Sequence, residues 1–117
     1  MITGTVSSAG VPVVALDVAG YRREAVIDTG FNGDLELPVD LKNLLPCRYV
    51  GQVTSLPAGD QRIDEDAFQV DFPFDGQIVR AEATFVIGQQ MLLGTHLLQS
   101  HRLEIDFPNR TVSSQHE

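Results

Sequence analysis

The sequence predicts an all-β domain with two short helices, and three observations predict this class. Most apolar residues either alternate with polar ones or form short runs of Val, Ile, Leu and Phe, as they do in strands. Combinations of Gly, Pro, Asn and Asp that favour turns separate these runs. The chain has 117 residues and is 43% hydrophobic, so we expect a single domain over residues 1–117 with its own core.

The first half of the chain contains three expected strands and one expected helix. Ala19-Gly20 suits the tight turn between the first two strands. Pro38 can occupy the first turn of a helix, where its missing N–H costs nothing, and Pro46 would end that helix. The expected elements are strands at residues 11–18, 21–27 and 35–37 and a helix of about two turns between the prolines.

The second half begins with a long predicted hairpin around the turn-forming tetrapeptide Pro57-Ala58-Gly59-Asp60. A further strand, a second short helix and a final hairpin follow. The expected elements are strands at residues 50–56, 63–72, 78–87, 103–107 and 111–113, a short strand at residues 92–94, and a helix at residues 95–100.

The charge balance excludes one class of partner. Sixteen acidic and eight basic residues give a formal net charge of −8, and no Lys/Arg cluster offsets it. Such a surface repels phosphate backbones, so we expect no nucleic-acid partner. No apolar stretch is long enough to span a bilayer, and the first residues lack the pattern of a signal peptide. We therefore expect no membrane association and a cytoplasmic location.

No residue pattern indicates a metal or another cofactor. Cys47 is the only cysteine, and it is interpreted as a small packed residue. His96, His101 and His116 lack the spacing of metal ligands, and His96 is expected on the second helix as a surface or partner-facing residue. Asp64-Glu65-Asp66 is interpreted as a solvated arm of the long hairpin and not as a calcium site.

The segment Asp28-Thr29-Gly30 follows a buried apolar run, Ala25-Val26-Ile27. A carboxyl group at the end of a buried strand is costly to desolvate, so its presence requires a reason. One reason is structural: the Asp side chain caps a turn, and Thr and Gly are ordinary turn residues. The other reason is chemical: glycines let a loop present a reactive carboxylate at close quarters. Taken alone, a match of three residues favours the structural reason.

The wider pattern resembles the retropepsin-like aspartic proteases. Val26-Ile27-Asp28-Thr29-Gly30 precedes a candidate flap hairpin, and Leu92-Leu93-Gly94 follows it, in the order of that family. Phe31, directly after the Asp-Thr-Gly motif, is similar to a prokaryotic branch. The resemblance extends over roughly residues 11–107. It implies a closed β-barrel or sandwich monomer with two short helices and a flap, a homodimer, and a peptide or protein substrate.

The resemblance also implies roles for individual residues. Asp28 would be the catalytic carboxylate, Thr29 would link the two loops at the dimer axis, and Gly30 would let the substrate backbone approach. Leu92-Leu93-Gly94 would pack behind the loop. The residues implied for substrate binding, in the flap and the cleft, are Phe31, Asn32, Leu56, Pro57, Ala58, Gly59 and Asp60.

The sequence departs from the retroviral pattern at Phe31, Asn32 and Thr95, which replace a small residue, an Asp and an Arg. An ion pair joining the loop to the second helix is therefore expected to be absent. The sequence predicts an aspartic endopeptidase that activates water between two Asp28 carboxylates, one from each chain. The alternatives are a dimeric binding module with this fold and little turnover, and a subunit that pairs with a different Asp-Thr-Gly chain.

Overall fold

The computed structural model describes residues 1–55 and 62–117, and over these ranges the chain is all-β, as predicted. Ten strands form one sheet in these ranges, accompanied by a single short 3₁₀ helix, η1. The elements are β1 (Ile2–Val6), β2 (Pro12–Val18), β3 (Tyr21–Ile27), β4 (Leu35–Pro38), η1 (Val39–Asn43), β5 (Cys47–Ser55), β6 (Ile63–Phe74), β7 (Gln77–Val86), β8 (Met91–Leu93), β9 (His101–Asp106) and β10 (Thr111–His116).

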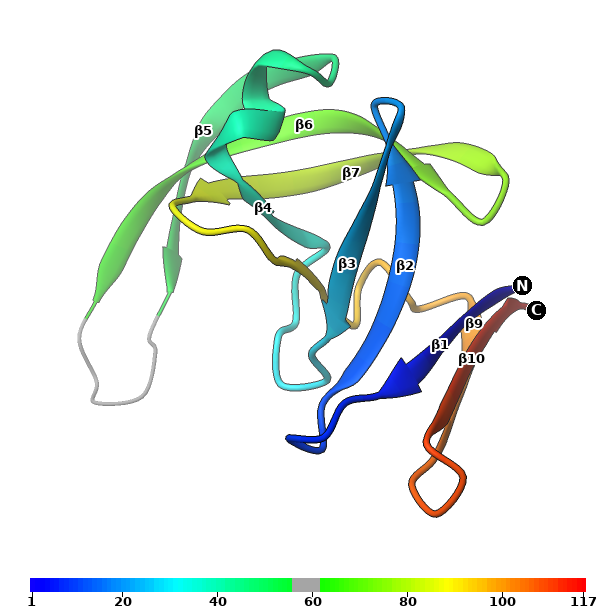
Figure 1. The fold of residues 1–117 in the computed structure, drawn as a ribbon. Helices are drawn as coiled ribbons and strands as arrows, with labels where there is room; N and C mark the ends of the chain where they lie inside the picture. The colour runs from blue at the N-terminus through cyan, green and yellow to red at the C-terminus, as the bar shows by residue number, and fades with distance from the viewer. Residues whose placement is uncertain (56–61) are drawn as a thin grey trace.

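The sheet is open, so the expectation of a closed barrel is wrong for the described part of the chain. Its strand order is β5-β6-β7-β4-β8-β3-β2-β1-β10-β9, which leaves β5 and β9 as edges. A barrel closes only when the first and last strands of the sheet pair. Here β5 and β6 instead extend as a hairpin arm away from β9 (Figure 1).

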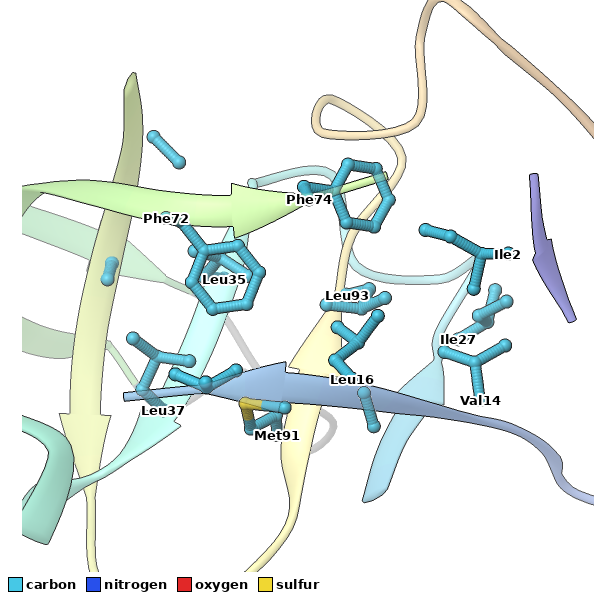
Figure 2. Packing of buried hydrophobic residues seen from close by; sticks show 14 of the residues in the cluster. Ile2, Val14, Leu16, Ile27, Leu35, Leu37, Phe72, Phe74, Met91 and Leu93 are labelled. Carbon is cyan, nitrogen blue, oxygen red and sulfur yellow. The ribbon is translucent and has the colours of Figure 1, made fainter. Parts of the chain in front are cut away.

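The core lies where the bent sheet brings β6 into contact with β2 (Figure 1). Phe72 and Phe74 of β6 project towards Leu16 of β2, with side chains of β4 and β8 between them (Figure 2). These positions alternate with polar or half-buried ones along their strands, as expected for strands with one face buried. The largest fully buried hydrophobic side chains are Phe72, Leu35, Leu37, Leu41, Met91, Leu93, Val14, Val18, Val70 and Val112.

The first predicted helix is shorter and tighter than expected. η1 covers Val39–Asn43, and the amides of both Leu44 and Leu45 donate to the carbonyl of Leu41. Leu41 and Leu45 are buried, whereas Leu44 is 48% exposed, so the three leucines do not share one buried face. Pro46 ends the segment, and β5 begins immediately after it, earlier than predicted.

The second predicted helix, at residues 95–100, is absent, and turns occupy its place. The amide of Gln99 donates to the carbonyl of His96, and the amide of His101 donates to the carbonyl of Leu98. Each of these hydrogen bonds spans three residues and closes a single turn, so they do not form a continuous α-helix. A segment this short forms too few helical hydrogen bonds to stabilise a helix without tertiary contacts. The amide of Thr95 instead bonds the carbonyl of Phe31, so tertiary contacts decide the backbone path.

One strand was not predicted at all. β1 lies between β2 and β10, and both of its partners run antiparallel to it. Only Ile2 and Val6 are buried in this strand, so its apolar alternation is too sparse to identify it. A Cβ at Gly4 would overlap the carbonyl of Val13, so β1 needs a glycine where it approaches β2.

Candidate functional site

A parallel strand pair positions Asp28. In β3 and β8, Val26 lies opposite Leu92 and Ile27 lies opposite Leu93. The amide of Asp28 extends this ladder by donating to the carbonyl of Leu93 at 3.0 Å. Because Ile27 and Leu93 are both buried in the core, the carboxyl end of β3 is fixed immediately before Asp28.

The backbone turns tightly at Asp28. The amide of Gly30 donates to Oδ1 of Asp28 at 3.0 Å, and the amide of Phe31 donates to the Asp28 carbonyl at 3.1 Å. The Asp28 side chain is half-buried, while Thr29 and Gly30 are exposed. The turn-capping role considered from the sequence is therefore present. It uses one oxygen of the carboxylate, and Oδ2 has no hydrogen-bond partner among the described residues.

The loop after Asp28 is bound to the turn that follows β8. Three backbone hydrogen bonds join them: Gly94 donates to Asp34 at 2.9 Å, Thr95 to Phe31 at 2.8 Å, and His96 to Gly33 at 3.1 Å. The Thr95 hydroxyl also lies 3.3 Å from the Phe31 carbonyl. Residues 28–34 are therefore held at both ends, which limits the positions open to the Asp28 carboxylate.

The half-buried Phe31 ring packs against two glycines. A Cβ at Gly33 would lie 2.8 Å from Cε1 of Phe31, and one at Gly94 would lie 2.8 Å from its Cδ2. A Cβ at Gly94 would also overlap the carbonyl oxygen of Gly33. Phe31 therefore supports the loop, and because its ring is only half-buried, its role in substrate binding stays a prediction. Asn32 is exposed.

A hydrogen bond between a carboxylate and a histidine joins this loop to the following turn, and it becomes an ion pair when the imidazole is protonated. The expectation that no ion pair joins the two segments is therefore wrong for the protonated form of His96. Oδ1 of Asp34 lies 2.6 Å from Nδ1 of His96. Oδ2 of Asp34 accepts a hydrogen bond from the amide of Glu82 in β7 at 2.9 Å. In the retroviral pattern the ion-pairing residues occupy the positions of Asn32 and Thr95. In this chain the interacting residues, Asp34 and His96, lie two residues and one residue further along. The signal available in the sequence was an acid before one strand and a histidine after another.

The same bond changes the acidity of the histidine. The hydrogen bond to Asp34 raises the pKa of the His96 imidazole, and the negative charge of that carboxylate raises it further. The Asp34 side chain is 11% exposed and that of His96 is 61% exposed, so the carboxylate is the inner member of the pair. His96 is therefore at the surface, as predicted, but it lies on a turn and not on a helix, and it is a partner of Asp34.

A second acid near Asp28 was missed by sequence reasoning. Glu36 lies in β4, opposite Leu92 of β8 and Thr84 of β7. Burial raises the pKa of the Glu36 carboxyl, and the negative charges of Glu65 and Asp28 raise it further. The signal was present in the alternation Leu35-Glu36-Leu37, which turns the acid away from the core.

The predicted flap is described only in its arms. β5 and β6 pair antiparallel from Cys47 opposite Val70 to Ser55 opposite Ile63, with an irregularity between Tyr49 and Gly51. The residues predicted for the tip, Leu56, Pro57, Ala58, Gly59 and Asp60, lie outside the described residues.

Residues 1–55 and 62–117 contain no group of three or more His, Cys, Asp or Glu side chains that could hold a metal ion. In the same ranges, no helix has the length and hydrophobicity needed to cross a bilayer. A cavity of about 230 Å³ lies beside the Asp34–His96 pair and the turn between β6 and β7, and Asp28 is not among its lining residues.

The fold is similar to that of a retropepsin-like aspartic protease of known structure. Neither the known family models nor the curated protein sequences give a significant match to this chain. Among solved structures, the chain is similar to the crystal structure of a retropepsin-like aspartic protease from Rickettsia conorii. The TM-score is 0.60 at 15% sequence identity, and the alignment covers 97% of this chain and 92% of that one.

Proposed function

We propose that the protein is an aspartic endopeptidase that works as a homodimer, with Asp28 of each chain in one shared site. The observation that carries the proposal is the placement of Asp28 in a retropepsin-like fold. It follows a core strand, its amide is bonded to Leu93, and its carboxylate stands in a turn whose other members, Thr29 and Gly30, are exposed.

The chemistry needs two carboxylates close together. At an effective dielectric constant near 20, two full charges about 4 Å apart repel by roughly 4 kcal/mol, which corresponds to about 3 pKa units. One carboxyl group of the pair therefore stays protonated while the other is ionised. Such a pair titrates as a unit, so neither pKa belongs to one residue.

The ionised carboxylate acts as the general base, and the protonated carboxyl group acts as the general acid. The ionised Asp28 removes a proton from a water molecule, whose oxygen forms a bond to the peptide carbonyl carbon. The protonated Asp28 gives its proton to the carbonyl oxygen, which yields a neutral tetrahedral diol. When the C–N bond breaks, the first Asp28 returns its proton to the departing nitrogen. A diol hydroxyl reprotonates the second Asp28 as the carboxylic acid product forms.

The sequence supplies only one Asp-Thr-Gly segment, so a second chain is needed for the second carboxylate. A two-fold axis next to the exposed Thr29 would bring two copies of the loop together and keep both sites identical. The core strands behind Asp28 and the hydrogen bonds to residues 94–96 make the loop rigid enough to hold such a contact.

The rival function is a binding module with the same fold and little turnover. From the sequence, its support was Phe31, directly after the Asp-Thr-Gly motif, and the expected loss of the ion pair between loop and turn. The Asp34–His96 contact weakens the second of these supports, because it fastens the same two segments. The endopeptidase is therefore the function that the geometry favours.

Incubation with a mixed peptide library between about pH 4 and pH 7, followed by mass spectrometry of the products, tests the proposal. The Asp28→Asn variant is the matched control, because Asn is nearly isosteric and cannot act as the base. We expect cleavage by the wild-type protein and loss of cleavage in the folded variant. Equal cleavage by both proteins, or none by either, would exclude the proposed mechanism.

A further inference from the structure

Glu36 projects from the face of the sheet that lies opposite the hydrophobic core. Its neighbours Leu35 and Leu37 are buried at 1% and 0% exposure, and successive side chains of a strand point to opposite faces. Its partners across the strands, Thr84 and Leu92, are half-buried and do not belong to the core cluster.

A short apolar strip connects Glu36 to the Asp28 loop on this face. Leu92 lies between Glu36 of β4 and Val26 of β3 in the strand register. Val26 is half-buried, lies outside the core cluster, and comes two residues before Asp28. Neighbouring strands lie about 4.8 Å apart, so Glu36 and Val26 are on the order of 10 Å apart. An extended peptide at Asp28 would pass over this strip within reach of Glu36.

Glu36 has no cationic partner among the described residues, in either ion pairs or hydrogen bonds. Residues 56–61, which the structure does not describe, contain no Lys, Arg or His in the sequence. The surrounding charges, Asp28 and Glu65, are also negative, and together with burial they raise the pKa of the Glu36 carboxyl. A half-buried carboxylate in such surroundings favours a cation brought by a ligand.

We propose that Glu36 determines specificity in the Asp28 site by pairing with a Lys or Arg side chain of the bound peptide. This inference rests on the proposed function, and it names the substrate class of that site as basic peptides. In a homodimer the two copies of Glu36 would select basic side chains at two positions related by the two-fold axis.

Binding of matched peptide libraries tests this role without requiring turnover. Each position of a fluorescent octapeptide is fixed in turn as Arg or citrulline, its neutral isostere, and in a second set as Glu or Gln. Affinity is measured by fluorescence anisotropy. For the wild-type protein we expect Arg to bind about tenfold more tightly at the positions that reach Glu36. Glu36→Gln should abolish the difference, and Glu36→Lys should favour Glu over Gln there. No preference in the wild type, or an unchanged preference in both variants, would overturn the inference.

Glu24→Gln is the matched control, because Glu24 is exposed and lies on the same face of β3 as Val26, further from Asp28. It removes the same charge and should keep the preference for Arg. Cleavage assays then separate the two proposals. Selective binding of Arg without cleavage would contradict the endopeptidase and support Glu36 as a binding determinant. Cleavage without Arg selectivity would support the endopeptidase and contradict the role of Glu36. A failure to bind or cleave any peptide would overturn both proposals.

Discussion

Oδ1 of Asp34 and Nδ1 of His96 lie 2.6 Å apart, although 62 residues separate them in the chain. The other oxygen of the same carboxylate accepts from the amide of Glu82. One side chain therefore ties the loop after Asp28 to the turn after β8 and to β7. Ionised acceptors make the stronger hydrogen bonds in proteins, so this carboxylate is a main anchor of the candidate site.

His96→Gln should destabilise the protein in a pH-dependent way. The pKa of His96 is raised above 6.5 in the folded state, so its contribution is fully present below about pH 6.5. The contribution is lost as the pH rises through the raised pKa. The difference in Tm between wild type and variant should therefore be largest in mild acid and shrink on the alkaline side. Comparing the two proteins cancels the opposing titration of His101, whose pKa burial lowers. A difference in Tm that grows with pH would contradict the Asp34–His96 pair.

Gly94→Ala should be among the more damaging small substitutions. The new Cβ would overlap the carbonyl of Gly33 and press on the Phe31 ring, so the loop that carries Asp28 must move. We expect a loss of about 2–3 kcal/mol in the free energy of unfolding, measured by urea denaturation. Gly10→Ala is the control: Gly10 has a positive φ of 81° but open space around it. Its replacement should cost about 1 kcal/mol. Equal losses would show that the close approach at Gly94 is unimportant.

Thr29→Ala should weaken dimerisation and leave the monomer stable. Thr29 is exposed and its hydroxyl has no partner among the described residues, so folding loses little. If each hydroxyl makes a bond across the dimer axis worth about 1 kcal/mol, two lost bonds raise the dissociation constant roughly 30-fold. Sedimentation equilibrium measures this change, and Thr111→Ala, at another exposed threonine, should leave it unaltered. An unchanged constant in Thr29→Ala would place the dimer axis elsewhere.

Mixing wild-type and Asp28→Asn chains tests the shared site directly. With free exchange and equal amounts, about a quarter of the dimers are fully wild type. These dimers hold half of the wild-type chains, so activity per wild-type chain should fall to roughly half. A monomeric enzyme, or one that pairs with another protein, would keep its full activity. Exchange of chains must first be demonstrated with tagged chains, because homodimers that never dissociate would also keep full activity per wild-type chain.

Residues that interact with near neighbours were predictable from the sequence. The strand at residues 21–27 was predicted with its correct bounds, because Ala25 and Ile27 mark the buried face of a strand that a Gly turn precedes. The turn at Asp28 was predictable for the same reason: an Asp two residues before a Gly can bond the amide of that Gly, and it does.

Relationships between distant segments were decided by the tertiary structure. The open sheet, the pairing of β1 with β10, and the turns at residues 95–100 depend on which strand edges meet. Asp34 lies in the loop after β3, and His96 lies in the turn after β8. They become partners only because β8 lies between β3 and β4 in the sheet, which brings this loop and this turn together. The position of Glu36 opposite Leu92, one strand away from Val26, likewise follows from the register of β4 on β8 and of β8 on β3. Local periodicity assigns a side chain to a face of its own strand, but the neighbours on that face depend on the strand register, which long-range packing selects.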